Sequence, residues 1–168
     1  MVQSTWMKPR VYLETTIASY LTAWPSRDLV MAANQATTRE WWENRKDAYQ
    51  LFISQTVIKE SSAGDQDAAQ RRLEFLKAFP LLNITEEVET LAAKLIAEVP
   101  LPLKAQADAV HIAVAAVHGM NYLLTWNCTH IANATLRTQI EAVTRSAGYE
   151  PPVVCTPQEM LGPGEQDA

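Results

Sequence analysis

The hydrophobic positions of the chain fall into two alternating patterns. The first is a short, continuous apolar run rich in β-prone residues, which recurs at residues 11–13, 51–54, 81–84, 121–125 and 153–154. Continuous apolar runs of this length are typical of parallel strands that are covered on both faces. The first pattern therefore predicts a buried, mostly parallel sheet of four to five strands.

The second pattern is helical and occupies the segments between the apolar runs. We expect helices at residues 17–21, 28–46, 56–60, 65–77, 85–98, 104–118 and 134–147. Gly119 and Gly148 follow two of these segments, where glycine commonly ends a helix. Ser26 or Asp28 is the expected N-cap of the second helix, and Thr56 that of the third.

Strands that alternate with helices predict an α/β fold, in which helices cover both faces of a central parallel sheet. The length of 168 residues fits one domain, and no internal repeat or linker divides the sequence. We expect a single domain over residues 1–168, with a polar leader at 1–9 and a frayed tail at 162–168.

Composition changes this picture little. Hydrophobic residues make up 48% and charged residues 20% of the chain, as in ordinary globular proteins. No apolar run approaches the roughly 20 residues that cross a bilayer, and the N-terminus lacks the apolar stretch of a secretory signal. We therefore expect no membrane association and a cytoplasmic location.

The two cysteines, Cys128 and Cys155, form no C-x-x-C pair, which predicts a chain without disulfides. Cys128 and His130 are two residues apart, but a closed zinc site needs about four ligands. The chain offers no second cluster of Cys and His, so we expect these two residues to be structural.

The formal net charge of −5 argues against one class of function. Modules that bind nucleic acid mainly by neutralising phosphates are usually basic. An acidic catalytic pocket, in which divalent ions supply the positive charge, is compatible with this balance.

Candidate chemistry comes from four polar residues at the predicted ends of strands and helices. Glu14 follows the first strand, Glu60 lies on the helix after the second, and Asp108 lies early in an alanine-rich helix. Asn127 follows the fourth strand. Ligands of open α/β sheets bind beyond the carboxyl ends of the strands, so we expect these groups to converge there. Taken singly, Glu14, Glu60 and Asn127 are also ordinary helix or turn residues.

Asp108 is the most informative of the four because it interrupts a series of small apolar residues, where a carboxylate needs a partner. His111 lies one helical turn later and is expected to support Asp108 or to pack beside it. Lys104, one turn earlier, either pairs with a carboxylate, touches a phosphate or is solvated. Asp65 either adds to the acidic cluster or caps the following helix.

Clustered carboxylates repel one another, and binding a hard divalent ion such as Mg²⁺ or Mn²⁺ relieves the repulsion. Such an ion lowers the pKa of a bound water and stabilises charge that develops during phosphodiester hydrolysis. The predicted acidic edge therefore favours metal-dependent hydrolysis.

Three segments of the sequence resemble the PIN domain family, particularly its VapC-type toxins. They are VYLETTIASYL at residues 11–21, ADAVHIAVAAVHG at 107–119 and YLLTWNCTHIAN at 122–133. Glu60 matches the family's second carboxylate by its place after the second strand, and the resemblance spans about residues 10–161. It implies a PIN-like three-layer α/β/α domain and a Mg²⁺- or Mn²⁺-dependent endoribonuclease. It also implies a homodimer that is silenced by a cognate antitoxin.

Carried over residue by residue, the resemblance assigns catalysis to Glu14, Glu60, Asp108 and Asn127. The first three become metal ligands, and Thr15 or Thr16 supports them. The family usually has Asp where this chain has Glu14 and Asn127, and Asn127 adds no charge. These departures weaken a site for a second ion, so the alternative is a catalytically weakened PIN scaffold that binds RNA or protein. A phosphatase-like doubly wound enzyme fits poorly, because Glu14 stands where its nucleophilic Asp would be.

The region from residue 17 to 46 is rich in tryptophan, with Trp24, Trp41 and Trp42. Exposed aromatic residues favour interfaces, so this region is the predicted docking place of a second protomer or an antitoxin helix. The alternative is that these tryptophans belong to the core.

Overall fold

A computed structural model of the chain describes residues 7–102 and 105–161. The predicted tail at 162–168, residues 1–6 of the predicted leader and Lys104 therefore lie outside the described residues. The strands are β1 (Arg10–Leu13), β2 (Gln50–Ser54), β3 (Leu81–Leu82), β4 (Tyr122–Leu124) and β5 (Val153–Cys155). They form one sheet in the order β3-β2-β1-β4-β5, and every neighbouring pair is parallel. The predicted parallel sheet is confirmed.

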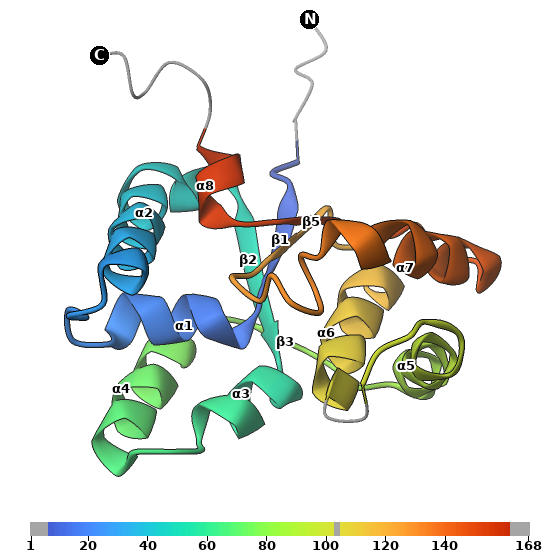
Figure 1. Ribbon diagram of the computed structural model, residues 1–168, viewed down its shortest axis with the longest axis horizontal. Coiled ribbons are helices and arrows are strands. Elements are labelled where there is room, and N and C mark those ends of the chain that lie inside the picture. Colours follow the sequence, from blue (N-terminus) through green and yellow to red (C-terminus); the bar gives the residue numbers. More distant parts are fainter. Residues whose placement is uncertain (1–6, 103–104, 162–168) are drawn as a thin grey trace, which may run out of the picture.

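The helices lie between these strands. They are α1 (Thr15–Thr22), α2 (Leu29–Arg45), α3 (Gln55–Ser61), α4 (Gln66–Leu76), α5 (Glu86–Glu98), α6 (Gln106–Val117), α7 (Ala134–Ser146) and α8 (Pro157–Met160), with the 3-10 helix η1 (Lys46–Ala48) before β2. Figure 1 shows α1, α2, α4 and α8 on one side of the sheet and α5, α6 and α7 on the other. The contacts agree, because α1 packs on α2 and α4, whereas α5 packs on α6 and α7. The predicted three-layer α/β/α architecture is confirmed.

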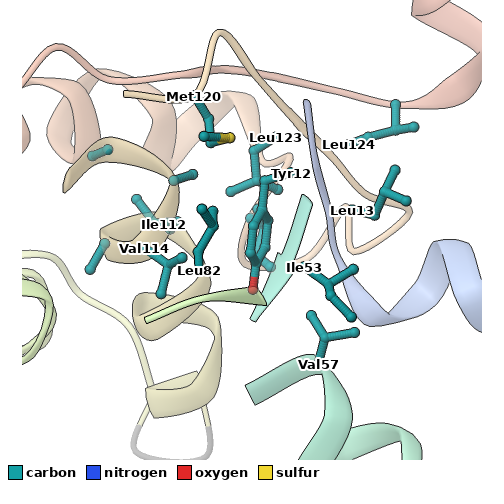
Figure 2. Close-up of a cluster of buried hydrophobic side chains, with 14 of the residues drawn as sticks. Tyr12, Leu13, Ile53, Val57, Leu82, Ile112, Val114, Met120, Leu123 and Leu124 are labelled. Atoms are coloured by element: carbon teal, nitrogen blue, oxygen red, sulfur yellow. The ribbon is translucent and has the colours of Figure 1, made fainter. Parts of the chain in front are cut away.

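The core lies on both faces of the central strand β1. Tyr12 lies with Leu123 and Ile112 on the side of α6, whereas Leu13 lies near Leu124 and Ile53 on the other side (Figure 2). Successive side chains of a strand point to opposite faces, so the continuous run at β1 covers both layers at once. All of these residues are at most 1% exposed. Burying each leucine or isoleucine stabilises the fold by about 1.5–3 kcal/mol.

The register of the sheet aligns the carboxyl ends of the two central strands. Leu13 of β1 pairs with Leu124 of β4. The Glu14 amide then donates to the Leu124 carbonyl at 3.1 Å. Glu14 and Thr125 therefore leave the sheet side by side.

Several boundaries differ from the sequence prediction. Helix α1 begins at Thr15 rather than near residue 17, because Glu14 is its N-cap and accepts a hydrogen bond from the Thr16 amide. Helix α3 begins at Gln55, so Thr56 lies within the helix and is not its cap. Strand β3 has two residues instead of four. Helix α8 was not predicted, although Thr156 and Glu159 form a capping box at its start.

Two predictions about helix ends are confirmed. Asp28 is the N-cap of α2, and Gly119 and Gly148 have positive φ angles after their helices. Cys128 and Cys155 are both free. Within the described residues, no helix combines the length and apolar character that crossing a membrane requires.

The tryptophans divide between core and surface. Trp41 is fully buried and Trp42 packs on Phe75, whereas Trp24, between α1 and α2, is 72% exposed. The core interpretation is confirmed for Trp41. The prediction of a docking place remains for the exposed Trp24.

Candidate active site

Glu14 lies at the junction of β1 and α1, and its carboxylate is turned back into the protein. The Thr16 amide donates to Glu14 Oε2 at 2.9 Å, and the Thr125 hydroxyl donates to the same oxygen at 3.3 Å. The side chain is 4% exposed. Burial raises the pKa of Glu14 above its ordinary value and the nearby Glu60 carboxylate adds to the rise, although His111 and Thr16 oppose it. Glu14 is therefore a desolvated carboxylate at the edge of the sheet.

Glu60 lies near the end of α3, and two donors meet at one of its oxygens. The Thr15 hydroxyl donates to Glu60 Oε1 at 2.5 Å, and His111 Nε2 lies 2.5 Å from the same oxygen. Burial by itself would raise the pKa of Glu60, but the interactions with His111 and Thr15 outweigh burial and hold it below its ordinary value. With a side chain 33% exposed, Glu60 is the more accessible of these two carboxylates.

Asp108, in the first turn of α6, is also held at both oxygens. Asn127 Nδ2 donates to Asp108 Oδ1 at 3.0 Å, and His130 Nδ1 lies 2.9 Å from Asp108 Oδ2. Asn127 Oδ1 in turn accepts the His130 amide at 3.2 Å, which fixes the orientation of the Asn127 amide group. The loop after β4 thus supplies two partners for Asp108.

Two threonines connect these groups. The Thr125 hydroxyl donates to Glu14 and accepts a hydrogen bond from the backbone N–H of Asn127 at 2.9 Å. The Thr16 hydroxyl accepts the Trp126 amide at 2.8 Å. The start of α1 and the loop after β4 are therefore joined, and Glu14, Glu60, Asp108 and Asn127 belong to one hydrogen-bonded edge of the sheet.

The supporting residues take different places from those the sequence suggested. His111 does not pair with Asp108, one turn away, but with Glu60 of another helix and with the Tyr12 hydroxyl at 2.6 Å. Asp65 caps α4 by accepting the Ala68 amide at 2.9 Å, which confirms the capping interpretation. Thr15 and Thr16 contact Glu60 and Glu14 respectively.

Sequence reasoning missed His130, Tyr12 and Ser54. His130 was considered only beside Cys128, although its position three residues after Asn127 in a loop was the signal that it could face the same site. Tyr12 and Ser54 lie in strands that read as uniformly buried, and their hydroxyls are 2.7 Å apart in the core. Nothing in the apolar pattern marks such a contact.

The donor atoms suit a hard cation, since Mg²⁺ and Mn²⁺ prefer carboxylate and amide oxygens. In the ranges 7–102 and 105–161, however, no group of three or more His, Cys, Asp or Glu side chains is arranged to hold a metal ion. Each carboxylate is engaged by protein donors instead. The ligand set of Glu14, Glu60 and Asp108 remains a prediction.

The chain forms a five-stranded parallel sheet between two helical layers. Glu14 and Asn127 follow its central strands, and Glu60 and Asp108 lie on the neighbouring helices α3 and α6, which defines an α/β domain with an acidic site. The sequence profile of the PIN domain matches residues 11–127. The chain belongs to the PIN domain family, as its sequence motifs predicted.

Two solved structures share the fold. One is VapC20 of Mycobacterium tuberculosis, a sarcin–ricin loop cleaving toxin, with a TM-score of 0.55 and 14% identity over 84% of this chain and 99% of the other. Another is VapBC2 of Rickettsia felis bound to a DNA fragment from its promoter, with a TM-score of 0.50 and 13% identity over 88% and 98%. A sequence search of curated proteins gives no match.

Proposed function

We propose that the chain is a Mg²⁺- or Mn²⁺-dependent endoribonuclease and the toxin component of a toxin–antitoxin pair. The observation that carries the proposal is the convergence of Glu14, Glu60, Asp108 and Asn127 on the carboxyl edge of the sheet in a PIN domain. Ligand sites of α/β sheets lie at this edge.

Each residue has a distinct role in this proposal. Glu60 and Asp108 are the more accessible carboxylates and would contact the RNA phosphate, while the buried Glu14 is held by Thr16 and Thr125. Asn127 holds Asp108 in place through its amide. Glu14, Glu60 and Asp108 would hold the divalent ion, because their oxygens suit it and a cation offsets the mutual repulsion of Glu14 and Glu60. When bound, such an ion activates water and stabilises charge on the phosphate.

The partners in the proposal follow the fold relatives. VapC20 is a toxin that cleaves the sarcin–ricin loop, and VapBC2 was solved on a promoter DNA fragment. We extend to this chain an RNA substrate, a cognate antitoxin, a homodimeric state and a cytoplasmic location. No particular RNA sequence is part of the proposal.

The test is RNA cleavage by the purified chain with Mn²⁺ or Mg²⁺. The Asp108→Ala variant is compared with Glu89→Ala, which removes an exposed carboxylate on α5, a helix that contributes no residue to the predicted site. We expect Asp108→Ala to lower kcat by at least about 100-fold, as for the loss of a principal electrostatic group. Full metal-dependent cleavage by Asp108→Ala would end the assignment.

A second candidate function is a PIN scaffold with weak catalysis that binds RNA or protein. It is favoured by the protein donors that occupy both oxygens of Asp108. The Asn127→Asp variant discriminates, since it replaces a donor to Asp108 with a second carboxylate. A large gain in metal-dependent cleavage indicates a weakened enzyme. A less stable protein with no gain indicates a site adapted to binding.

A further inference from the structure

A chain of buried hydrogen bonds runs through the core and ends at Glu60. The Ser54 hydroxyl of β2 lies 2.7 Å from the Tyr12 hydroxyl of β1, and the Tyr12 hydroxyl lies 2.6 Å from His111 Nδ1 of α6. His111 Nε2 then lies 2.5 Å from Glu60 Oε1 of α3. Ser54, Tyr12 and His111 are at most 1% exposed. Four separate elements thus contribute one residue each to a continuous polar path.

The chemistry of the groups gives the last bond of this path a direction. An ionised carboxylate only accepts hydrogen bonds, so His111 Nε2–H donates to Glu60. At the other end of the ring the roles of His111 Nδ1 and the Tyr12 hydroxyl depend on the tautomer, and either of the Tyr12 and Ser54 hydroxyls can be the donor to the other. Each polar group of the path has a partner, as buried polar groups generally do.

The path fixes one oxygen of Glu60 and leaves the other available. Glu60 Oε1 receives both His111 Nε2 and the Thr15 hydroxyl. Among the described residues, no donor reaches Glu60 Oε2. The two bonds on Oε1 prevent the carboxylate from rotating, so that Oε2 has a defined position at the accessible edge of the site.

Burial favours an apolar side chain at position 111, because its neighbours along the helix, Ala109, Ile112 and Ala113, are completely buried. Placing an imidazole there costs desolvation unless both nitrogens have partners. The partners on both sides show that the ring is held in one orientation. Of the two partners of the ring, Glu60 is the one that lies at the predicted site, so the orientation of His111 bears on Glu60.

We propose that His111, oriented by Tyr12 and Ser54, is a positioning residue that aims Glu60 Oε2 at the reacting water or phosphate. This inference rests on the proposed nuclease function and names a part of its machinery beyond the carboxylates. His111 acts through Glu60 and makes no contact with substrate.

The kinetic test compares three variants with the wild-type chain. His111→Leu removes the donor to Glu60, Tyr12→Phe removes the group that orients the ring, and His111→Gln retains a donor at the place of Nε2. We expect His111→Leu to lower kcat about 10- to 100-fold with little change in KM, as for partners that orient site residues. Tyr12→Phe should have a smaller effect of the same kind, and His111→Gln should recover most of kcat.

Tyr122→Phe is the matched control, because Tyr122 begins the neighbouring strand β4, contacts Tyr49 and lies at the opposite end of the strand from the site. We expect wild-type kcat for this variant. A folded His111→Leu variant with wild-type kcat overturns the proposal, as does His111→Gln behaving like His111→Leu.

A second measurement separates this inference from the proposed function. Long-range ¹H–¹⁵N NMR of the wild-type chain reports which nitrogen of His111 carries the proton, whether or not the protein cleaves RNA. The proposal requires a proton on Nε2, which donates to Glu60, and an Nδ1 signal that changes in Tyr12→Phe. An Nε2 without a proton overturns the positioning path. Lack of RNA cleavage by the wild type, with the expected NMR pattern, removes the nuclease function but leaves the path in place.

Discussion

At the scale of single residues, the two glutamates of the site have opposite electrostatic environments. Burial raises the pKa of Glu14, whereas His111 and Thr15 outweigh burial at Glu60 and hold its pKa below the ordinary value. Glu14 is the buried N-cap of α1, and α3 leaves Glu60 partly open to solvent. Two identical side chains therefore affect folding in opposite directions as the pH changes.

We predict that Glu14→Gln stabilises the protein near pH 7 and loses this advantage in acid. Because the folded pKa of Glu14 lies above its unfolded value of about 4.3, the ionised side chain destabilises the folded state above the raised pKa. At neutral pH the melting temperature should rise by about 2–4 °C, which corresponds to about 1 kcal/mol at this chain length. The gain should vanish as the pH falls through the folded pKa towards the unfolded one.

Glu60→Gln is the matched comparison, measured by thermal melts over the same pH series. The lowered pKa of Glu60 means that its contribution to stability is present above the unfolded pKa and is lost as the pH falls below it. Glu60→Gln should therefore lower the melting temperature at neutral pH. If both variants shifted stability in the same direction, the contrast between the two environments would be refuted.

At the scale of elements, short connections bring helix starts directly to the strand ends. Helix α1 follows β1 after Glu14 alone, and α3 follows β2 with no intervening residue. Helices α2 and α4 instead begin at aspartate caps, Asp28 and Asp65, away from the strand ends. Glu14 and Glu60 are thus carried at or close after strand ends, whereas Asp108 lies on α6, which follows helix α5.

We predict that Asp65→Ala acts on stability alone. The Asp65 carboxylate accepts the Ala68 amide at the start of α4, and losing such a cap costs about 0.5–2 kcal/mol. Urea unfolding should show this loss, and Asp65→Asn should restore most of it, because asparagine caps equally well. If folded Asp65→Ala cleaved RNA more slowly than its loss of stability explains, Asp65 would instead be part of the acidic site.

At the scale of the whole molecule, the negative net charge opposes the binding of an RNA substrate. The chain carries a formal net charge of −5, and three carboxylates lie along one edge of its sheet. A surface of this sign repels phosphate, so association with RNA depends on a local positive charge. A divalent ion at the acidic edge supplies that charge in the proposed function.

We predict that Mn²⁺ stabilises the whole fold through this edge. A ligand that binds only the native state at 100 times its dissociation constant adds about 2.7 kcal/mol. Calorimetric Mn²⁺ titration and thermal melts should show both binding and stabilisation for the wild-type chain and for Glu89→Ala. Asp108→Ala should lose both. A wild-type chain that binds no Mn²⁺ would favour the binding scaffold over the nuclease.

The sequence predicted most of the fold. The apolar runs identified all five strands, and the parallel arrangement followed from their continuous burial. The boundary errors at α1 and α3 have one cause: both helices start at strand ends, where Glu14 and Ser54 occupy the N-cap positions. Helix α8 was missed because its four residues are too short for a periodic pattern.

The sequence by itself indicated which residues lie near the carboxyl edge, because parallel strands all run in one direction and their carboxyl ends lie at the same edge. The tertiary structure alone decided which of them touch. His111 was expected beside Asp108, three residues away, but pairs with Glu60, 51 residues away, and Asp108 pairs with His130. Periodicity describes the face of one helix, whereas these contacts depend on how α3 and the loop after β4 pack against α6. Local sequence patterns therefore predict where the carboxylates lie along the chain. Their hydrogen-bond partners, and the pKa shifts that these partners cause, form only when the helical layers pack on the sheet.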